Sequence, residues 1–307
     1  CMVVEMAITE DGKITRSRFY RGVIHSKARL TYTQVSQWLI EGRADVQHEP
    51  LFPMLQSLHT LYRILNETRK LRGAMDFDTT ETRIEFDENR KIQRIIPVIR
   101  NDAHRLIEEC MLAANVATAR FLEKAKIPTL YRVHAAPEED KVIGLRKFLG
   151  ELGLQLGGGK KPNPKDFQRT LAAIGDRPEK HLIETVMLRS LKQAQYIESN
   201  DGHFGLAYSA YTHFTSPIRR YADLAVHRAL SALIKRDKSR LPAARSLPDV
   251  ALHISDTERR AMMAERDASD RYKVLFMSRF IDNNNTENGD PIQYLGTSII
   301  DKSTGAD

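Results

Sequence analysis

Residues 215–223 combine the side-chain types that bind a phosphate group. Ser216 and Pro217 are typical of a helix start, because serine accepts from free N–H groups of the first turn and proline leaves none unpaired. Those N–H groups and the positive end of the helix dipole attract an anion. Arg219 and Arg220 fall in the first turn, where a cation is disfavoured without an anionic partner. The run therefore predicts a helix from Pro217 with a phosphate site at its start.

Two further side chains follow on the same predicted helix. Asp223 lies one turn beyond Arg219, and His227 lies one turn beyond Asp223, so the three share a slowly drifting face. Asp223 could orient Arg219 or support a metal ion, and Arg220 could contact a bound strand or be structural. An ordinary capped surface helix with an ion pair between Arg219 and Asp223 would have the same short pattern.

The flanking sequence is more specific than the short run. Residues 203–207 read His-Phe-Gly-Leu-Ala, and residues 211–224 read Tyr-Thr-His-Phe-Thr-Ser-Pro-Ile-Arg-Arg-Tyr-Ala-Asp-Leu, with His227 and Arg228 beyond. This stretch closely resembles the hallmark of the ribonuclease II and ribonuclease R (RNB) family, nearest the ribonuclease R branch. Further segments resemble the same family in chain order, at residues 28–32, 101–109, 188–194 and 264–267.

Composition sets wider limits. A chain of 307 residues with 41% hydrophobic content can bury a large core, and its net charge of +7 suits a polyanionic partner without requiring one. Cys1 and Cys110 give neither a disulfide framework nor zinc-ligand spacing, so we expect no disulfide partner and a cytoplasmic location. The sequence contains no apolar run near the ~20 residues that span a bilayer and no secretory pattern, so we expect no membrane association.

Hydrophobic periodicity predicts a helix-rich α+β fold in which helices wrap antiparallel strands. The polar, turn-rich residues 281–307 predict a loosely ordered tail after a partial RNB-type catalytic domain at residues 1–280. The expected strands are residues 1–8, 14–24, 83–86 and 92–96, with a turn at Asp11 and Gly12. The expected helices are residues 33–40, 52–72, 102–126, 138–152, 164–174, 178–196, 217–234 and 248–277.

Two glutamates border apolar helix faces. Glu109 lies beside the buried stripe of its predicted helix, where a carboxylate either joins a peripheral salt bridge or faces a polar cavity. The resemblance favours the cavity, because Glu109 matches a position that lines the RNA channel of the family. Glu265 belongs to a stripe that alternates acids with small residues, which is either a solvated face or room for a ligand. Glu265 also matches a family site residue.

Tyr32 and Phe77 match positions at which the family stacks aromatic rings on RNA bases. Stacking tolerates any base, and contributes about 1–3 kcal/mol per base. The resemblance implies that Tyr32 helps to set the length of the residual product and that Phe77 clamps the terminal base. Without the resemblance, each residue would be read as an ordinary core aromatic.

The resemblance implies a Mg²⁺-dependent 3′-to-5′ exoribonuclease that hydrolyses single-stranded RNA to nucleoside 5′-monophosphates. The family holds Mg²⁺ with aspartates upstream of the stretch that matches residue 1, so we expect no metal ligand in this chain, which could be inactive alone. Asp76 and Asp78 are the nearest imitation of that cluster. The implied roles are catalytic for Arg219, Glu109 and Glu265, RNA-binding for Tyr32, Phe77, Arg220 and Ser216, and supporting for Asp223 and His227.

Two other functions stay open at this point. A non-catalytic protein or scaffold that kept the channel without the metal cluster would bind single-stranded RNA and leave it intact. If the chain is instead a helical adaptor with no RNA role, the substitution Arg219→Ala should leave all of its binding unchanged.

Overall fold

The computed structural model describes residues 1–77, 81–237, 239, 241, 243–281, 286–287 and 290–291. Helices dominate it, and its strands pair two by two in antiparallel ladders. The α+β, helix-rich class predicted from the sequence is therefore confirmed.

The elements follow one another in an order close to the predicted one. The helices are α1 (Tyr32–Glu41), α2 (Phe52–Arg72), α3 (Asp102–Lys124), α4 (Glu139–Glu151), α5 (Pro164–Ile174), α6 (Lys180–Ser190), α7 (Tyr221–Lys235) and α8 (Leu247–Ile281), with short 3-10 turns η1 (Glu49–Leu51) and η3 (Ala244–Ser246). The paired strands are β1 (Met2–Ile8) with β2 (Ile14–Arg21), β3 (Thr82–Phe86) with β4 (Ile92–Pro97), β5 (Tyr131–Val133) with β6 (Gln195–Ile197), and β7 (Thr286–Glu287) with β8 (Asp290–Pro291).

The opening hairpin forms as predicted, and its turn rests on α2. Gly12 has a φ of 74°, in the region that favours glycine. A Cβ at Gly12 would lie 2.0 Å from Thr68 Oγ1, so the close approach also excludes a larger residue. Thr68 Oγ1 donates a hydrogen bond to the carbonyl of Asp11 at 3.2 Å. The turn is therefore fixed against α2.

The predicted helix over residues 178–196 is wrong in its last part. α6 ends at Ser190, and the chain then continues as strand β6. Tyr196 pairs with Arg132 in β5, and its N–H donates to Ser255 Oγ at 2.9 Å. These partners lie far away in the sequence, so a local helical pattern gives no sign of them.

Helix α3 runs through the middle of the fold. Its residues 112–119 are all buried, which indicates a helix covered on every side. One core cluster joins α3 to β2 and α7 through Leu122, Phe19 and Val226. Asn101 starts the helix, and its side chain accepts from the N–H of His104 at 3.2 Å.

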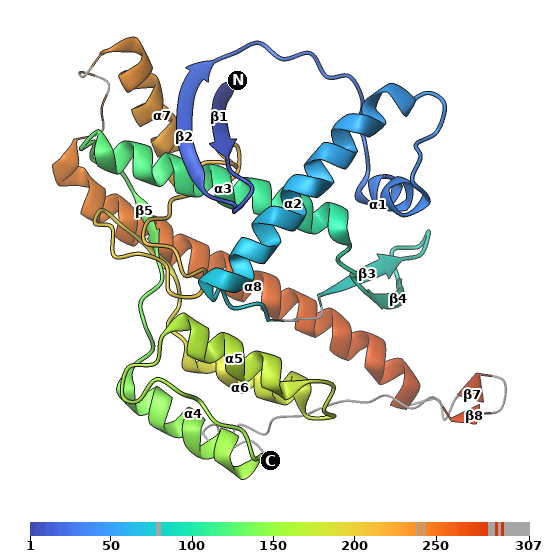
Figure 1. The fold of residues 1–307 in the computed structure, drawn as a ribbon. Coiled ribbons are helices and arrows are strands. Elements are labelled where there is room, and N and C mark those ends of the chain that lie inside the picture. The colour runs from blue at the N-terminus through green and yellow to red at the C-terminus, as the bar shows by residue number, and fades with distance from the viewer. Residues whose placement is uncertain are drawn as a thin grey trace.

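Figure 1 shows where the other helices lie relative to α3. Helix α2 crosses α3 beside the β1–β2 hairpin, and α8 passes along the other side as one long rod. Helices α4, α5 and α6 lie together at one end of the molecule. Their core cluster includes Leu149, Phe167, Ile183 and Met187, all fully buried.

Two further sequence expectations concern the chain end and the environment. The predicted loose tail at residues 281–307 lies outside the described residues, apart from 281, 286–287 and 290–291. None of the described helices combines the length and the apolar character that a membrane span needs. Cys1 is exposed, Cys110 is partly buried, and both thiols are free.

We expect Phe167→Ala to lower the free energy of unfolding by about 3–5 kcal/mol, because it leaves a large void in a fully buried site. Urea unfolding followed by circular dichroism measures the change. Leu188→Ala is the matched control, since Leu188 is 45% exposed on the same helical group, and its loss should be much smaller. Equal losses for the two variants would contradict this location of the core.

Candidate functional site

The segment before α7 forms a turn rather than the predicted first turn of a helix. The N–H groups of Arg219 and Arg220 both donate to the carbonyl of Ser216, at 3.3 and 3.1 Å. Arg220 then adopts an extended backbone and is the N-cap of α7, which begins at Tyr221. The predictions of a helix from Pro217 and of a capping role for Ser216 are therefore wrong.

The buried carboxylate of Asp223 is the reason for this geometry. Asp223 is 0% exposed and accepts from the N–H of Ser216 at 2.7 Å. It also accepts from Arg220 Nε at 2.7 Å and from Arg220 Nη2 at 2.8 Å. Because one carboxylate binds the Ser216 backbone and the Arg220 side chain, residues 216–220 are held as a closed turn.

The two arginines consequently have different environments. Burial alone would lower the pKa of Arg220, but the hydrogen bonds and charge of Asp223 raise it above its ordinary value. Arg219 is exposed, and its side chain makes no hydrogen bond or ion pair with the described residues. The alternative in which Asp223 pairs with Arg219 is thus not the one observed. The turn presents Arg219 outward while Arg220 is held inside.

The side chains of His227 and Asn115 make hydrogen bonds that hold the loop before the turn, at residues 211–215. His227 Nε2 lies 2.8 Å from the carbonyl of Phe214, and the two rings stack with centroids 4.7 Å apart. Asn115 in α3 accepts from the N–H of Phe214 at 2.9 Å and donates to the hydroxyl of Tyr211 at 3.0 Å. His227 and Asn115 therefore both hold the loop, and Asn115 was not among the predicted residues.

Two partly buried histidines, His203 and His213, lie shortly before the turn at residues 216–220. His213 Nδ1 lies 2.7 Å from the hydroxyl of Tyr196, and His203 Nδ1 accepts from the N–H of Leu206 at 3.2 Å. Burial, helped by nearby positive charge, lowers the pKa of His213 to about 2 and that of His203 to about 3. Both rings are therefore neutral at neutral pH and act as fixed polar contacts.

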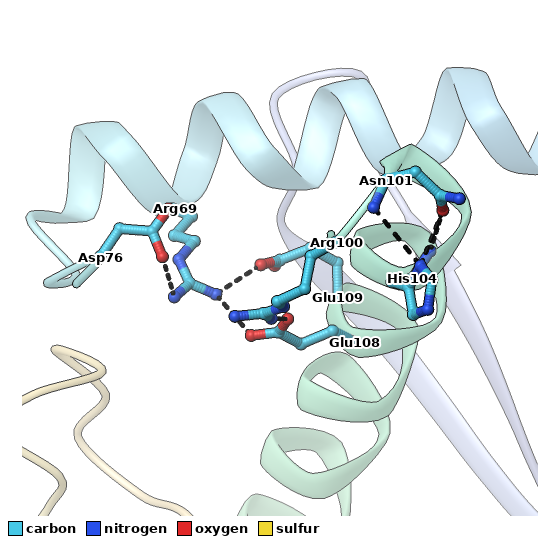
Figure 2. Close-up of polar contacts among 7 residues, drawn as sticks. All are labelled: Arg69, Asp76, Arg100, Asn101, His104, Glu108 and Glu109. Atoms are coloured by element: carbon cyan, nitrogen blue, oxygen red, sulfur yellow. Dashed lines mark hydrogen bonds and ion pairs between the residues drawn. The ribbon is translucent and has the colours of Figure 1, made fainter. Parts of the chain in front are cut away.

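Glu109 and Phe77 line one cavity, which forms a second part of the site. Figure 2 shows Glu109 with its ion-pair partners. Glu109 is only 5% exposed, and its Oε1 accepts from Arg69 Nη1 at 2.8 Å. Burial raises the pKa of Glu109, although Arg69 opposes the shift. The two residues border a cavity of about 460 Å³. Glu109 thus both joins a salt bridge and faces a polar cavity, the two alternatives that its position left open.

Arg69 forms ion pairs with three carboxylates of this cavity. The sequence did not predict this role. Besides Glu109, Arg69 contacts Glu108 Oε1 at 3.3 Å and Asp76 Oδ1 at 3.3 Å (Figure 2). Glu108 also pairs with Arg100. A signal was present in the sequence, since Arg69 continues the buried line of Tyr62 and Leu65 along α2.

The remaining predicted residues lie apart from these two groups. Tyr32 begins α1, is 45% exposed, and stacks on His104 at a centroid distance of 4.0 Å. Because His104 belongs to the first turn of α3, Tyr32 lies beside the same helix that carries Glu109. Glu265 is exposed on α8, and no contact among the described residues joins it to Arg219 or Glu109.

Helix α8 is held in place by contacts at Glu258, seven residues before Glu265. Glu258 Oε2 accepts from Arg132 Nη1 at 2.6 Å, and the same guanidinium lies 4.6 Å from the ring centroid of Tyr196. Glu265 follows Glu258 by two helical turns, so it lies along the same line of α8. The anchored half of the helix therefore sets the direction in which Glu265 is presented.

The described residues do not fit a Mg²⁺ site. They contain no group of three or more His, Cys, Asp or Glu side chains arranged to hold a metal ion. Asp76 instead pairs with Arg69, and Asp78 lies outside the described residues. A hard divalent cation needs several free carboxylate oxygens, whereas arginines pair with at least one oxygen of each carboxylate in the cavity, namely Asp76, Glu108 and Glu109.

We expect the stability of the chain to fall as the pH decreases from 7 to 5. Histidines in the unfolded chain have a pKa near 6.5. Below that pH the unfolded state binds protons that His203 and His213 do not take up in the folded state, so the unfolded state is favoured. Each contributes a slope that rises towards about 1.4 kcal/mol per pH unit as the pH falls below 6.5. Urea unfolding at pH 7, 6 and 5 measures the slope. His203→Gln should flatten it, whereas His25→Gln, at an exposed histidine, should not.

We also expect Asp223→Ala to cost about 3–5 kcal/mol of stability, because it leaves the Arg220 charge and the Ser216 N–H without their acceptor. Asp223→Asn keeps the size and one acceptor oxygen and should cost less. Urea unfolding of both variants gives the comparison. A wild-type midpoint for Asp223→Ala would show that the turn is held by other contacts.

Comparison with known proteins gives a consistent result. Residues 1–236 match the RNB domain. Ribonuclease R of Vibrio cholerae is 47% identical over 291 residues, and ribonuclease R of Escherichia coli K12 is 43% identical over 290 residues. Each match covers 90% of this chain and 35% of the relative. The chain thus spans about a third of the length of these curated relatives.

Solved structures of the same family agree with these sequence matches. The apo form of Mycoplasma genitalium RNase R has a TM-score of 0.86 and 31% identity, with 91% of this chain and 44% of that chain covered. The same protein has been solved with ribose-methylated single-stranded RNA and with double-stranded RNA. Yeast Ssd1, described as a pseudonuclease, has a TM-score of 0.60 and 21% identity, which shows a likeness of fold alone. The extent and identity of these matches establish that the chain belongs to the RNB domain family, with ribonuclease R proteins as its relatives.

Proposed function

We propose that this chain is part of a Mg²⁺-dependent 3′-to-5′ exoribonuclease that hydrolyses single-stranded RNA to nucleoside 5′-monophosphates. The observation that carries the proposal is the turn at residues 216–220, where Asp223 holds Arg220 and leaves Arg219 exposed and unpaired among the described residues. The ribonuclease R relatives and the RNA-bound Mycoplasma genitalium structures support RNA as the substrate.

Arg219 is the proposed catalytic cation. When a phosphodiester is attacked, negative charge grows on its non-bridging oxygens. The turn fixes the backbone that carries Arg219. A guanidinium that contacts these oxygens more strongly in the transition state than in the ground state meets the requirement for catalysis. Because Arg220 is bound to Asp223, its role is to shape the turn, and Ser216 contributes its backbone rather than a cap.

The other proposed contacts are to the RNA strand. Phe77 borders the same cavity as Glu109, so a terminal base stacked on Phe77 would bring its ribose near that carboxylate. The exposed ring of Tyr32 offers a second stacking surface beside α3. Glu265 would approach the strand from α8. These assignments rest on the family resemblance together with the positions described above.

Mg²⁺ would polarise the phosphate and supply a hydroxide nucleophile once bound. Since the described residues offer no cluster of free carboxylates, we assign its ligands to the part of the relatives that this chain does not cover. The residues of this chain then bind and orient the strand. We also propose a cytoplasmic location, in line with two free cysteines.

A non-catalytic RNA-binding protein is the second candidate. One observation favours it for the chain as it stands, namely that the carboxylates around the cavity are paired with Arg69 and Arg100. Such a protein would bind single-stranded RNA with an affinity that falls as salt increases, and would leave it intact.

The test incubates 5′-labelled single-stranded RNA and Mg²⁺ with the 307-residue chain and with the full-length protein that contains it, and follows RNA length on a denaturing gel. We expect the full-length protein to shorten the RNA to a small residual oligomer. Arg219→Ala should slow this by about 10²–10³-fold, as loss of one charge-stabilising donor does, with an unchanged urea midpoint. Arg245→Ala, at an exposed arginine outside the stretch that resembles the family hallmark, is the matched control and should retain activity.

Each part of the proposal has its own contrary outcome. Equal rates for wild type and Arg219→Ala would remove Arg219 from catalysis. RNA that is bound but stays intact with the full-length protein and Mg²⁺ would support the non-catalytic candidate. Shortening by the 307-residue chain alone would overturn the assignment of the metal ligands to the uncovered part.

A further inference from the structure

A second cavity, of about 510 Å³, lies on another side of α3. Of its described lining residues, Glu109 alone has a role in the function proposed above. The cavity is bordered by the hairpin turn, by α2, by α3 and by the segment at residues 207–209. Glu109 borders this cavity as well as the one that contains Phe77. Its volume falls within the range of small-ligand sites, about 300–1,000 Å³.

Arg72 is held rigidly in the wall of this cavity. Its Nε donates to the carbonyl of Leu206 at 3.0 Å, and its guanidinium carbon lies 3.8 Å from the ring centroid of Tyr208. Arg72 Nη2 is buried and has no hydrogen-bond partner among the described residues. A guanidinium fixed on an aromatic ring with donors to spare is pre-organised for an acceptor.

The charges around the cavity are mainly positive. Arg120 also lines it, is exposed, and forms no ion pair with the described residues. Lys13 lines it too, although its ammonium group pairs with Asp11 at 2.6 Å on the surface. Glu109 is the acidic side chain of the described lining, and Arg69 already holds it at 2.8 Å.

The protonation of Arg72 reflects this excess of positive charge. Burial lowers its pKa, and the neighbouring charges of Arg69 and Arg120 lower it further, while Tyr208 and Glu109 act in the opposite direction. An arginine stays charged despite such a shift, so the folded chain carries, among its described residues, positive charges without anionic partners beside an open cavity. An anion in that space would relieve their repulsion.

We propose that the cavity lined by Arg72 and Arg120 binds a phosphate group. The planar fork of a guanidinium matches two oxygens of a phosphate, and a second arginine on the opposite helix provides another contact from α3. The phosphate can belong to an RNA strand, to a mononucleotide or to free inorganic phosphate, which share the same chemistry. The proposal does not depend on hydrolysis, so it stands or falls separately from the exoribonuclease assignment.

The test titrates inorganic phosphate into the 307-residue chain by calorimetry, at constant ionic strength set with chloride. We expect saturable binding, and a dissociation constant about tenfold weaker for Arg120→Ala, which removes one charge-assisted contact from an exposed position. Arg16→Ala is the matched control, because Arg16 is exposed on β2 outside the cavity, and its affinity should equal that of wild type. Arg72→Lys keeps the charge but loses the fork and should also bind more weakly.

Two results would overturn the proposal. One is the lack of phosphate-specific heat in the wild-type chain. The other is an equal affinity for wild type, Arg120→Ala and Arg16→Ala, which would show only a general effect of net charge. Because Arg120 is exposed, the unfolding midpoint of Arg120→Ala should match wild type and rule out misfolding as the cause.

The source of the phosphate is identified by measuring the affinity for a labelled ten-nucleotide oligouridine by fluorescence anisotropy. If the site holds the phosphate of a strand, Arg120→Ala will bind RNA more weakly and with a salt slope reduced by about 1. If the site holds free phosphate or a mononucleotide, RNA binding will be unchanged while calorimetry with phosphate and with adenosine 5′-monophosphate shows the loss. Both results support a phosphate site and differ only in its source.

Discussion

The buried carboxylate of Asp223 is the contact on which the geometry of the site depends. A fully buried charge is tolerated only when hydrogen bonds replace its hydration, and here three N–H groups from Ser216 and Arg220 do so. The same contacts fix the backbone of residues 216–220. The outward position of Arg219 is therefore a consequence of satisfying its neighbours, and not of any contact that Arg219 itself makes.

Helix α3 transmits this constraint to the rest of the molecule. Asn115 ties the helix to the loop before the turn, while Glu109, less than two turns away, forms the wall of the cavity with Phe77. Near its start, His104 supports the ring of Tyr32. One helix that is buried along residues 112–119 thus positions side chains that come from distant parts of the chain. Rigid elements of this kind hold a site more closely than loops do.

Much of this architecture could be predicted from the sequence, because the signals are local. The spacing of apolar residues and the glycine at position 73 gave α2 its bounds, and Pro164 marked the start of α5 correctly. The short strand β6 was missed because its pairing with β5 joins residues far apart, such as Arg132 and Tyr196. The helix start at Pro217 was wrong for a related reason, since a serine followed by proline resembles a cap whether or not a nearby carboxylate takes its N–H.

The site was predictable in its residue types and less so in its pairings. Glu109 was placed at the border of the buried face, but its partner Arg69 lies 40 positions away, and no local rule links the two. Likewise, the i,i+4 spacing in the sequence suggested Arg219, and not Arg220, as the partner of Asp223. Only the folded geometry distinguishes the i,i+3 pair with Arg220 from the i,i+4 pair with Arg219. The functional roles assigned to Arg219 and Glu109, like those of Tyr32, Phe77 and Glu265, stay proposals.

The contacts that hold the turn differ greatly in the length of chain that they close. Arg220 and Asp223 are three positions apart, so their pairing orders little of the chain, whereas Asn115 and Phe214 are 99 positions apart. The entropy lost on closing a loop grows with the logarithm of its length, by about 0.6 kcal/mol for each doubling. Forming the turn itself therefore loses little conformational entropy, and attaching it to α3 accounts for most of the entropy that is lost. The two are separable properties: one is encoded within nine consecutive residues, and the other belongs to the topology of the whole fold.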